Sequence, residues 1–563
     1  MADTPSADEI AQQLAQLREN YRARLPAELA ALAALAGPLH EGENARTRLE
    51  ELHAQLHRLA GAGGTFGLPA LSAQARVLEQ QARLWLTGSP DTMEAQAWRA
   101  FSADVARLGE IALNAPPPSP PPAARIRDEQ PGPDQPIQIW LVEDDPDIAA
   151  HFLQQLESFN YAVRHFLRIA DAEAAAQSQR PDLLIMDIMF PEQAENATQV
   201  LALRPTLRAM ECPLLFVTAN DDFQSRAGAA RLGAEGYFLK PLDMPRLINR
   251  ITQIFDKRRA PQPRVLIIDD DVALAEHARL TLLAAGMEAK VLHQPEIIIE
   301  TVAAFNPELV LMDLHMPDYS GPELAGVIRQ HDRWSSLPIV YLSAETDLDR
   351  QIAAMGRGAD DFLTKPISDA QLVAAVRARI ERARQLDAQI TRDSLTGLLK
   401  HASIKEAHEI AVGRARRIGK PVTVAMLDID HFKSVNDRYG HAVGDVVIVS
   451  LAMLLRQRLR QSDIIGRYGG EEFVAILPEC DADNARQLLE DIRQRFATVG
   501  FSHNGQAFCC TLSAGLASSD HYPDARGAEL LVMADEALYV AKGGGRNQVC
   551  AADPDASSGD TRP

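Results

Sequence analysis

Two similar sets of acidic side chains follow apolar runs that are typical of β-strands. The first set is Glu143, Asp144 and Asp187, and the second is Asp269, Asp270 and Asp313. In an open parallel sheet the carboxyl ends of neighbouring strands share one crevice, so we expect each set to converge. Three crowded carboxylates repel one another, and a hard divalent cation with oxygen ligands relieves that repulsion. Each set therefore predicts a site for one Mg²⁺ ion.

A hydroxyl and a lysine complete each set. The first is followed by Thr218 and Lys240-Pro241, and the second by Ser343 and Lys365-Pro366. These groups could hold the oxygens of a phosphoryl group while the lone acid, Asp187 or Asp313, acts as the nucleophile. The alternative is that the acids are merely solvated at the starts of loops. It does not account for the same order of residues occurring twice.

A third group of chemistry-bearing residues lies near the C-terminus. The apolar run VTVAML leads to Asp428, and RYGGEEFVAIL carries Glu471 and Glu472. We expect the second segment to be a hairpin that turns at Gly469-Gly470, because glycine tolerates the positive φ of a two-residue loop. Carboxylates on two adjacent strands are a common scaffold for two Mg²⁺ ions on a nucleoside triphosphate. The alternative is a hairpin with incidental acids.

Basic and amide side chains around this hairpin complete a nucleotide site. Lys433, Lys542 and Arg546 could hold phosphates. Asn436 and Asp445 could bind a purine edge, and an aspartate acceptor facing two N–H donors favours guanine.

A histidine near the N-terminus has small residues beside it. In LHRLAGAGGTFGL, His57, Gly61 and Gly64 fall on one face of a helix. Small residues beside an exposed imidazole would let another protein approach it closely. The alternative is an ordinary surface histidine in an alanine-rich bundle.

The middle of the chain contains a repeat of alternating strands and helices. Strands are expected over 137–145, 183–187, 214–218 and 236–241, and again over 264–271, 309–313, 338–343 and 360–366. The offset of roughly 125 residues indicates a duplicated domain. Alternating βα units predict a parallel sheet with helices on both faces.

Leucines at three- and four-residue spacing predict helices before this repeat, and a mixed domain follows it. The segment 369–393 carries a helical stripe that suits either a short coiled coil or an amphipathic helix packed on its own domain. We divide the chain into 1–114 (helical), 115–136 (proline-rich linker), 137–257 and 264–380 (the repeat), 381–392 (helical linker), 393–550 (mixed) and 551–563 (tail expected to be disordered).

Composition narrows the possible functions. The net charge is −20, which argues against a nucleic-acid partner. The five cysteines show no metal-binding or disulfide spacing, and no apolar run reaches the ~18 residues of a membrane span. The N-terminus is acidic and lacks an apolar core, so it does not read as a signal peptide. We therefore expect a cytoplasmic protein.

Each copy of the repeat resembles the receiver domain of two-component response regulators, a flavodoxin-like, doubly wound α/β fold. The resemblance implies that Asp187 and Asp313 accept phosphoryl groups and that the carbonyls of Met189 and His315 complete the metal shells. Tyr237 and Phe362 stand where the family has its switch aromatic. The second copy keeps the usual MPDYSG turn. The first has MFPEQAEN, without the glycine, so we expect an irregular loop and a receiver that is tuned or mainly structural.

Residues 393–549 resemble the GGDEF domain of diguanylate cyclases, a palm-like α+β fold that condenses two GTP into cyclic di-GMP. DSLTGL, NDRYGHAVGD and GGEEF carry the resemblance. It implies that Asp428, the Ile429 carbonyl and Glu471 bind Mg²⁺. It leaves open whether Glu472 is a metal ligand or assists deprotonation of the ribose 3′-OH. The implied substrate contacts are Gly469, Gly470, Lys433, Asn436, Asp445, Lys542 and Arg546. Lys400 departs from the family's usual asparagine.

Two further resemblances concern regulation. RQSD, with Arg460 and Asp463, lies five residues (464–468) before Gly469, which matches the family's RxxD product-inhibition site; the alternative is a chance surface pair. The family's second inhibitory arginine cannot be placed, and Asp491 lies near its expected position. The N-terminal helices resemble the histidine phosphotransfer (Hpt) domain, a four-helix bundle, which implies that His57 carries a phosphoryl group. Ala60 replaces that family's usual lysine, and Arg58 is nearby.

These resemblances imply a PleD-type response regulator with an added Hpt domain. The expected function is a phosphorelay-regulated diguanylate cyclase that works as a homodimer and releases two pyrophosphates. Its expected partners are GTP, cyclic di-GMP and a sensor histidine kinase or another phosphorelay protein. Two alternatives stay open: a non-enzymatic cyclic di-GMP receptor, and a phosphorelay scaffold whose output is protein docking.

Overall fold

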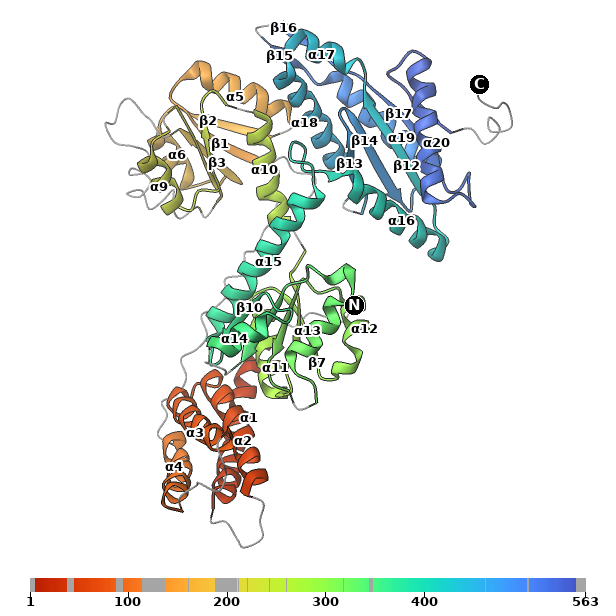
Figure 1. Cartoon of the computed structure of the whole chain (residues 1–563). Helices are drawn as coiled ribbons and strands as arrows, with labels where there is room; N and C mark the ends of the chain where they lie inside the picture. Colours follow the sequence, from red (N-terminus) through yellow and green to blue (C-terminus); the bar gives the residue numbers. More distant parts are fainter. Residues whose placement is uncertain are drawn as a thin grey trace. The chain divides into compact units, whose positions relative to one another are not determined.

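The structure is a computed structural model (Figure 1), and it divides into two compact units. The first unit is Met1–Asp128 with Pro261–Leu386, and the second is Glu129–Ala260 with Asp387–Pro563. Within them the structure describes residues 6–37, 45–87, 95–113, 137–159, 161–187, 210, 212–219, 221–242, 244–259, 261–316, 318–343, 348–460, 462–503 and 506–552. The proline-rich linker, most of the predicted tail and the MFPEQAEN segment lie outside these residues.

The N-terminal part of the first unit is a four-helix bundle, coloured red to orange in Figure 1. Its helices are α1 (Ala7–Leu35), α2 (Ala45–Thr65), α3 (Pro69–Thr87) and α4 (Ala95–Leu113). Leucines at the predicted spacing fill its core, among them Leu25, Leu29, Leu52 and Leu56. The predicted all-helical fold is confirmed.

The same unit contains the second receiver, which has a parallel sheet in the order β10-β9-β8-β6-β7. Its elements are β6 (Arg264–Ile268), α11 (Val272–Ala284), β7 (Glu288–Leu292), η2 (Pro295–Ile297), α12 (Ile298–Phe305), β8 (Leu309–Asp313), α13 (Gly321–Arg329), η3 (Asp332–Trp334), β9 (Ile339–Ser343), α14 (Leu348–Met355), β10 (Asp361–Thr364) and α15 (Asp369–Thr391). Strands β6, β8 and β9 lie at its centre, buried on both faces, which explains their continuous apolar runs.

The second unit contains the first receiver, whose sheet has the equivalent order β2-β1-β3-β4-β5. Its described elements are β1 (Gln138–Val142), α5 (Pro146–Ser158), β2 (Ala162–Phe166), α6 (Ile169–Ala176), β3 (Leu183–Asp187), β4 (Leu214–Thr218), α9 (Phe223–Arg231), β5 (Gly236–Leu239) and α10 (Met244–Arg259). The identical strand order in both sheets confirms the doubly wound fold of the duplicated domain.

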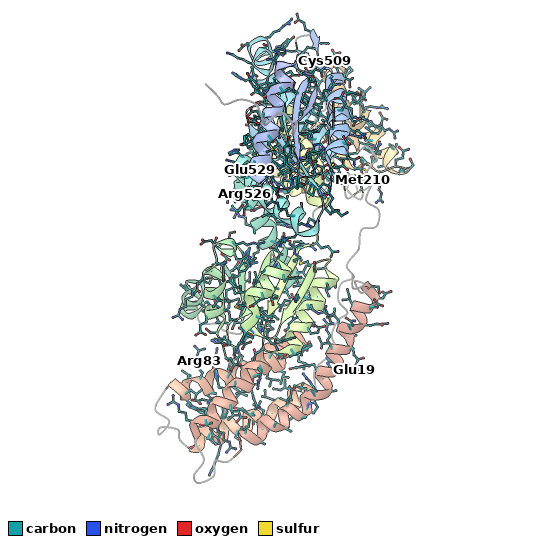
Figure 2. The ribbon with its side chains drawn as sticks, turned by 90° about the vertical axis from the view of Figure 1, so that its right-hand side faces the viewer. Glu19, Arg83, Met210, Cys509, Arg526 and Glu529 are labelled. Carbon is teal, nitrogen blue, oxygen red and sulfur yellow. The ribbon has the colours of Figure 1, made fainter. Side chains whose placement is uncertain are left out.

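The C-terminal domain of this unit is built on a six-stranded mixed sheet in the order β11-β13-β14-β12-β17-β18. Its elements are β11 (Leu399–Lys400), α16 (His401–Ile418), β12 (Val422–Ile429), α17 (Phe432–Tyr439), α18 (His441–Arg458), β13 (Ile464–Gly469), β14 (Glu472–Pro478), α19 (Ala482–Thr498), β15 (Phe501–His503), β16 (Gln506–Phe508), β17 (Leu512–Ser518), α20 (Gly527–Gly543) and β18 (Val549–Ala551). Figure 2 shows Arg526 and Glu529 together at the start of α20, where the Arg526 backbone N–H donates to the Glu529 carboxylate at 2.7 Å.

Helix α10 of the first receiver packs on α18 within the second unit. Val449 and Met453 of α18 join the apolar core of that receiver. Arg456 forms an ion pair with Asp256 at 2.6 Å, and the Asn249 side-chain amide donates to the Ser394 carbonyl at 2.9 Å. The last helix of this receiver is therefore joined to the mixed domain by both apolar and polar contacts.

Helix α15 divides the stripe predicted over 369–393 into two parts. Val376 and Ile380 are buried in the core of the second receiver, as expected for an amphipathic helix on its own domain. Leu386 and Ile390 are 45% and 74% exposed. The packed-helix interpretation is thus confirmed for the first half. A coiled coil through the second half stays a prediction.

The GGEEF turn differs by one residue from the predicted hairpin. Gly469 pairs with Glu472 across the ladder, so the two-residue loop is Gly470-Glu471 rather than Gly469-Gly470. The register shifts between Arg467 and Gly469, and that irregularity carries Gly469 into the strand. Gly470 alone adopts a positive φ, +41°. As a result, Glu471 lies at the tip of the hairpin and Glu472 begins β14.

Candidate phosphoryl and nucleotide sites

The acids of the second receiver converge at the carboxyl ends of β6 and β8. Carboxylate oxygens of Asp269, Asp270 and Asp313 lie within 4.8 Å of one another. The Lys365 Nζ is 2.9 Å from Asp269 and 2.7 Å from Asp313. Ser343 ends β9 and is fully buried. The predicted residues thus lie together. We call Asp269, Asp270, Asp313 and Lys365 the charged cup.

Charge and burial oppose each other in this cup. Burial raises the pKa of Asp269 to about 6 and also raises that of Asp270, each helped by the Asp313 charge. Burial alone would lower the pKa of Lys365, but Asp313 and Asp269 together raise it. Three acids therefore share one ammonium group. A divalent cation with oxygen ligands fits this donor set, and Asp269, Asp270 and Asp313 would hold it.

The first receiver repeats the arrangement. Oxygens of Glu143, Asp144 and Asp187 lie within 4.8 Å of one another, and the Lys240 Nζ is 2.8 Å from Glu143 and 2.6 Å from Asp187. Burial raises the pKa of Glu143 and of Asp144. Thr218, at the end of β4, is buried beside them in the sheet. Met189, predicted as a carbonyl ligand, lies outside the described residues.

In the C-terminal domain, Asp428 on β12 lies opposite Glu472 on β14 in the sheet register. Burial raises the pKa of Asp428, and the charges of Glu471 and Glu472 raise it further. Asp428 and Glu472 are thus cross-strand neighbours, and Glu471 lies beside Glu472 in the β13–β14 loop. A cation would relieve the repulsion among these carboxylates, so the residue types fit Mg²⁺. Lys542 already lies there, with its Nζ 2.7 Å from the Asp428 carboxylate.

The predicted guanine contacts lie on α17 and α18. The Oδ1 atom of Asn436 is buried and has no hydrogen-bond partner within the described structure. Asp445 is exposed on the first turns of α18. Lys433 on α17 and Arg546 after α20 are also exposed. An orphaned carbonyl oxygen suits a ligand that brings an N–H donor.

Sequence reasoning missed the role of Asp430. Its carboxylate accepts hydrogen bonds from Thr511 and Ser513, both at 2.7 Å, and from the Asn547 backbone N–H at 3.0 Å. Asp430 thus ties the end of β12 to β17 and to the loop that carries Arg546. The only signal in the sequence was the D-x-D spacing of Asp428 and Asp430 after an apolar run. The hydrogen bonds then show that Asp430 supports the site.

Arg467 connects the start of this domain to the GGEEF hairpin. Its guanidinium is 3.2 Å from the Asp393 carboxylate, and its Nε donates to the Gly470 carbonyl at 2.8 Å. Asp393 belongs to the DSLTGL segment, whose Thr396 backbone N–H also donates to it at 2.8 Å. Lys400, the departure from the family pattern, donates to the Gln389 carbonyl at the end of α15.

The RxxD pair lies between α18 and β13. The Asp463 carboxylate accepts from the Arg460 backbone N–H at 2.7 Å, which leaves the Arg460 side chain exposed. Asp491, near the expected place of a second arginine, instead binds Arg458 at 2.8 Å and Arg495 at 2.9 Å. Two arginines, Arg458 and Arg495, therefore lie against the acid at that position.

His57 lies on α2 with its ring largely covered. Its Nδ1 is 2.6 Å from the Glu79 carboxylate of α3. Burial lowers the pKa of His57, but the Glu79 hydrogen bond and charge outweigh it, and the pKa is raised overall. Glu79 was not predicted from the sequence, because acids are common on the exposed faces of helices.

Comparisons with known proteins identify three kinds of domain in the chain. A family model for the diguanylate cyclase GGDEF domain matches residues 390–548, one for the response regulator receiver domain matches 139–252 and 265–377, and one for the Hpt domain matches 8–110. Within the described residues, no helix is both long and apolar enough to cross a membrane.

The response regulator PleD of Caulobacter vibrioides is 28% identical over 450 residues, which cover 73% of this chain and 98% of that protein. The diguanylate cyclase DgcP of Pseudomonas aeruginosa is 41% identical over 175 residues, covering 31% of this chain and 25% of that protein. A solved GGDEF domain of DgcB from Caulobacter crescentus, in complex with c-di-GMP, is 35% identical, covering 29% of this chain and 95% of that one with a TM-score of 0.28. The chain therefore belongs to the diguanylate cyclase response regulators, with an Hpt domain and two receivers before its GGDEF domain.

Proposed function

We propose that the chain condenses two GTP into cyclic di-GMP and two pyrophosphates as a homodimer, under phosphorelay control and with product inhibition through the RxxD pair. The observation that carries the proposal is that Asp428 pairs with Glu472 across the strands, binds Lys542 at 2.7 Å and feels the charge of Glu471 on the adjacent loop. The proposal places the reaction in the cytoplasm, where the five free cysteines would stay reduced.

The proposed roles follow the chemistry of the side chains. Asp428, Glu471 and the Ile429 carbonyl would hold two Mg²⁺ ions, which would offset charge on the triphosphate. Lys433, Lys542 and Arg546 would bind phosphate oxygens, so Lys542 would exchange its contact with Asp428 for the substrate. Asn436 and Asp445 would hold guanine, and Gly469 and Gly470 would let the nucleotide lie against the backbone. Glu472 remains either a metal ligand or an aid to 3′-OH deprotonation.

The dimer follows from the product. Each ribose 3′-OH forms a bond to the α-phosphorus of the other nucleotide, and each α–β phosphate bond breaks to release pyrophosphate. One GGDEF domain holds one GTP, so two domains must face each other. Tethering two of them raises their effective concentration to the order of millimolar. The receivers would provide that tether, and phosphorylation of Asp187 or Asp313 by a kinase or relay partner would favour it.

Purified protein incubated with GTP and Mg²⁺ tests the enzyme assignment. We expect cyclic di-GMP and pyrophosphate in a ratio of one to two, measured by chromatography. Binding of cyclic di-GMP without any synthesis would favour the receptor alternative. Neither binding nor synthesis would favour the scaffold. The intact GGEEF signature favours the enzyme.

Product inhibition gives a separate prediction. Arg460→Ala removes an exposed guanidinium from the RxxD pair while leaving the metal-binding edge unchanged. We expect the initial rate with fresh GTP to stay within about twofold of wild type. The concentration of cyclic di-GMP that halves the rate should rise at least about tenfold, because the variant loses one charged hydrogen bond to the product. Arg417→Ala, an exposed arginine at the end of α16, is the control. Unchanged sensitivity to product in Arg460→Ala would refute the inhibitory site.

A further inference from the structure

The face of α2 that carries His57 packs against the second receiver inside the first unit. The His57 and His315 rings lie edge to face with centroids 5.8 Å apart. A Cβ at Gly61 would lie 3.5 Å from the Lys365 Cδ, and one at Gly64 would overlap the Pro366 ring. The small residues predicted to admit a partner thus admit the receiver's own Lys-Pro turn.

Apolar contacts hold the two domains together around this point. Ile10 and Leu14 of α1 form a buried cluster with Leu280 of α11. Leu274 of α11 belongs to the apolar core of the bundle itself. The leucine stripe of α1 therefore extends beyond its own bundle because its first turns cover the receiver.

Polar contacts surround the apolar ones. Arg18 of α1 forms an ion pair with Asp369 of α15 at 2.9 Å, and Asp369 also binds the buried His277 of α11 at 2.8 Å. Arg76 of α3 donates to the Lys365 carbonyl. The receiver and the bundle are therefore joined by an apolar contact with polar contacts around it, as in a complementary interface.

The reactive groups of both domains lie near its centre. His57 packs on His315, two residues after Asp313, and the charges of Asp313 and Lys365 act on the His57 ring. Since the Glu79 carboxylate can only accept, it favours the proton on Nδ1, so the neutral form of the ring presents the Nε2 lone pair. Building on the phosphorelay function proposed above, we propose that His57 Nε2 exchanges a phosphoryl group with Asp313 of the same chain, and not with Asp187, and that Glu79 positions the ring for this transfer.

The exchange balances without another reactant besides the phosphoryl donor. When phosphohistidine gives up its group, the Nε2–P bond breaks and its electron pair returns to the imidazole. An Asp313 carboxylate oxygen supplies the electron pair of the new O–P bond. The Nδ1 proton stays with His57, next to Glu79, and the reverse transfer uses the same atoms.

The first receiver differs from the second at two residues of this interface. Counting from the helix-capping Asp145 and Asp271, Gln154 stands where the second receiver has Leu280. Counting from the two Lys-Pro pairs, Met244 stands where it has Asp369. Gln154 is exposed and polar, and Met244 is buried in its own domain. These differences support the choice of Asp313 over Asp187.

Labelling the full chain with a radioactive small acyl phosphate and Mg²⁺ tests the proposal. Phosphohistidine is distinguished by its stability in base and lability in acid. We expect label at His57 in wild type and in Asp187→Asn, and at least a tenfold loss in Asp313→Asn. Full label at His57 in Asp313→Asn would overturn the proposal. The readout is independent of cyclic di-GMP synthesis, so a failed cyclase assay would leave it intact.

Matched glycine variants test the docked face. Gly64→Ala would overlap Pro366, whereas Gly109→Ala on α4 meets nothing within 4 Å. We expect transfer from Asp313 to His57 to slow at least tenfold in Gly64→Ala and to be unchanged in Gly109→Ala, with Asp313 labelled normally in both. If circular dichroism shows that Gly64→Ala does not fold, Leu280→Gln replaces it in the test. This variant introduces the residue of the first receiver, and we expect it to slow the transfer at least tenfold. Wild-type transfer in a folded Gly64→Ala or Leu280→Gln chain would contradict the docking.

Dilution and a positioning variant complete the test. Transfer within one chain keeps its first-order rate on tenfold dilution, and a rate that falls tenfold would overturn the single-chain assignment. Glu79→Ala should slow transfer and lower the pKa of His57 in an NMR titration, while Glu79→Gln, which keeps an acceptor oxygen, should restore part of the rate. An unchanged rate and His57 pKa in Glu79→Ala would remove Glu79 from the proposal.

Discussion

Glu471→Ala is expected to reduce cyclic di-GMP synthesis at least about 100-fold, because it removes a carboxylate that, in the proposed function, would hold the ions that stabilise charge in the transition state. Glu471 occupies the hairpin tip, where the sheet does not depend on its side chain. The variant should therefore stay folded, as circular dichroism would check. Glu479→Ala, at the far end of the same strand pair, is the control. Substantial synthesis by Glu471→Ala would contradict the assignment of Glu471 as a metal ligand.

Lys365→Met should destabilise the second receiver by about 3–5 kcal/mol, because it leaves Asp269 and Asp313 buried without their counter-ion. Methionine keeps the apolar stem that contacts Gly61. The loss should grow between pH 5 and pH 8. Burial raises the pKa of Asp269 to about 6 although Lys365 lowers it, so without Lys365 that pKa rises further. A carboxyl whose folded-state pKa is raised loses its stabilising contribution as the pH rises, so the variant falls further below wild type at higher pH.

Thermal unfolding of the full chain measures this effect, with Lys290→Met, an exposed lysine of the same receiver, as the control. Mg²⁺ should restore most of the loss, because the ion takes over the charge balance of the three acids. A variant as stable as wild type at pH 8 without Mg²⁺ would contradict the charged-cup description.

The sequence predicted the secondary structure best for strands that are buried on both faces. The runs LLIMD, LLFVT and LVLMD became strands over the expected residues because central parallel strands are apolar on both faces. The acids after them converged, since the ends of such strands share one edge. The GGEEF turn was wrong by one residue. The two adjacent glycines fit a loop at either Gly469-Gly470 or Gly470-Glu471. The irregularity between Arg467 and Gly469 selects the second, and no local sequence pattern predicts that irregularity.

Long-range contacts were beyond the sequence. Leu274 and Leu280 look like ordinary core residues of a receiver helix, yet they contact the bundle. Likewise, Asp393 and Arg467 are 74 residues apart and pair only because the sheet places β13 beside the domain's first turn. Asp430 was visible in the sequence, but its support role depends on Thr511 and Ser513 of a distant strand.

The central claim is that phosphorylation controls a dimeric cyclase, and one measurement tests it most directly. The full chain is treated with a small acyl phosphate at a series of protein concentrations, and cyclic di-GMP synthesis is recorded together with dimer mass from light scattering. The account predicts that specific activity rises with concentration and with phosphorylation, in step with the dimer fraction, and that Asp187→Asn/Asp313→Asn loses the response to the phosphoryl donor. Full activity from a chain that remains monomeric at every concentration would contradict it.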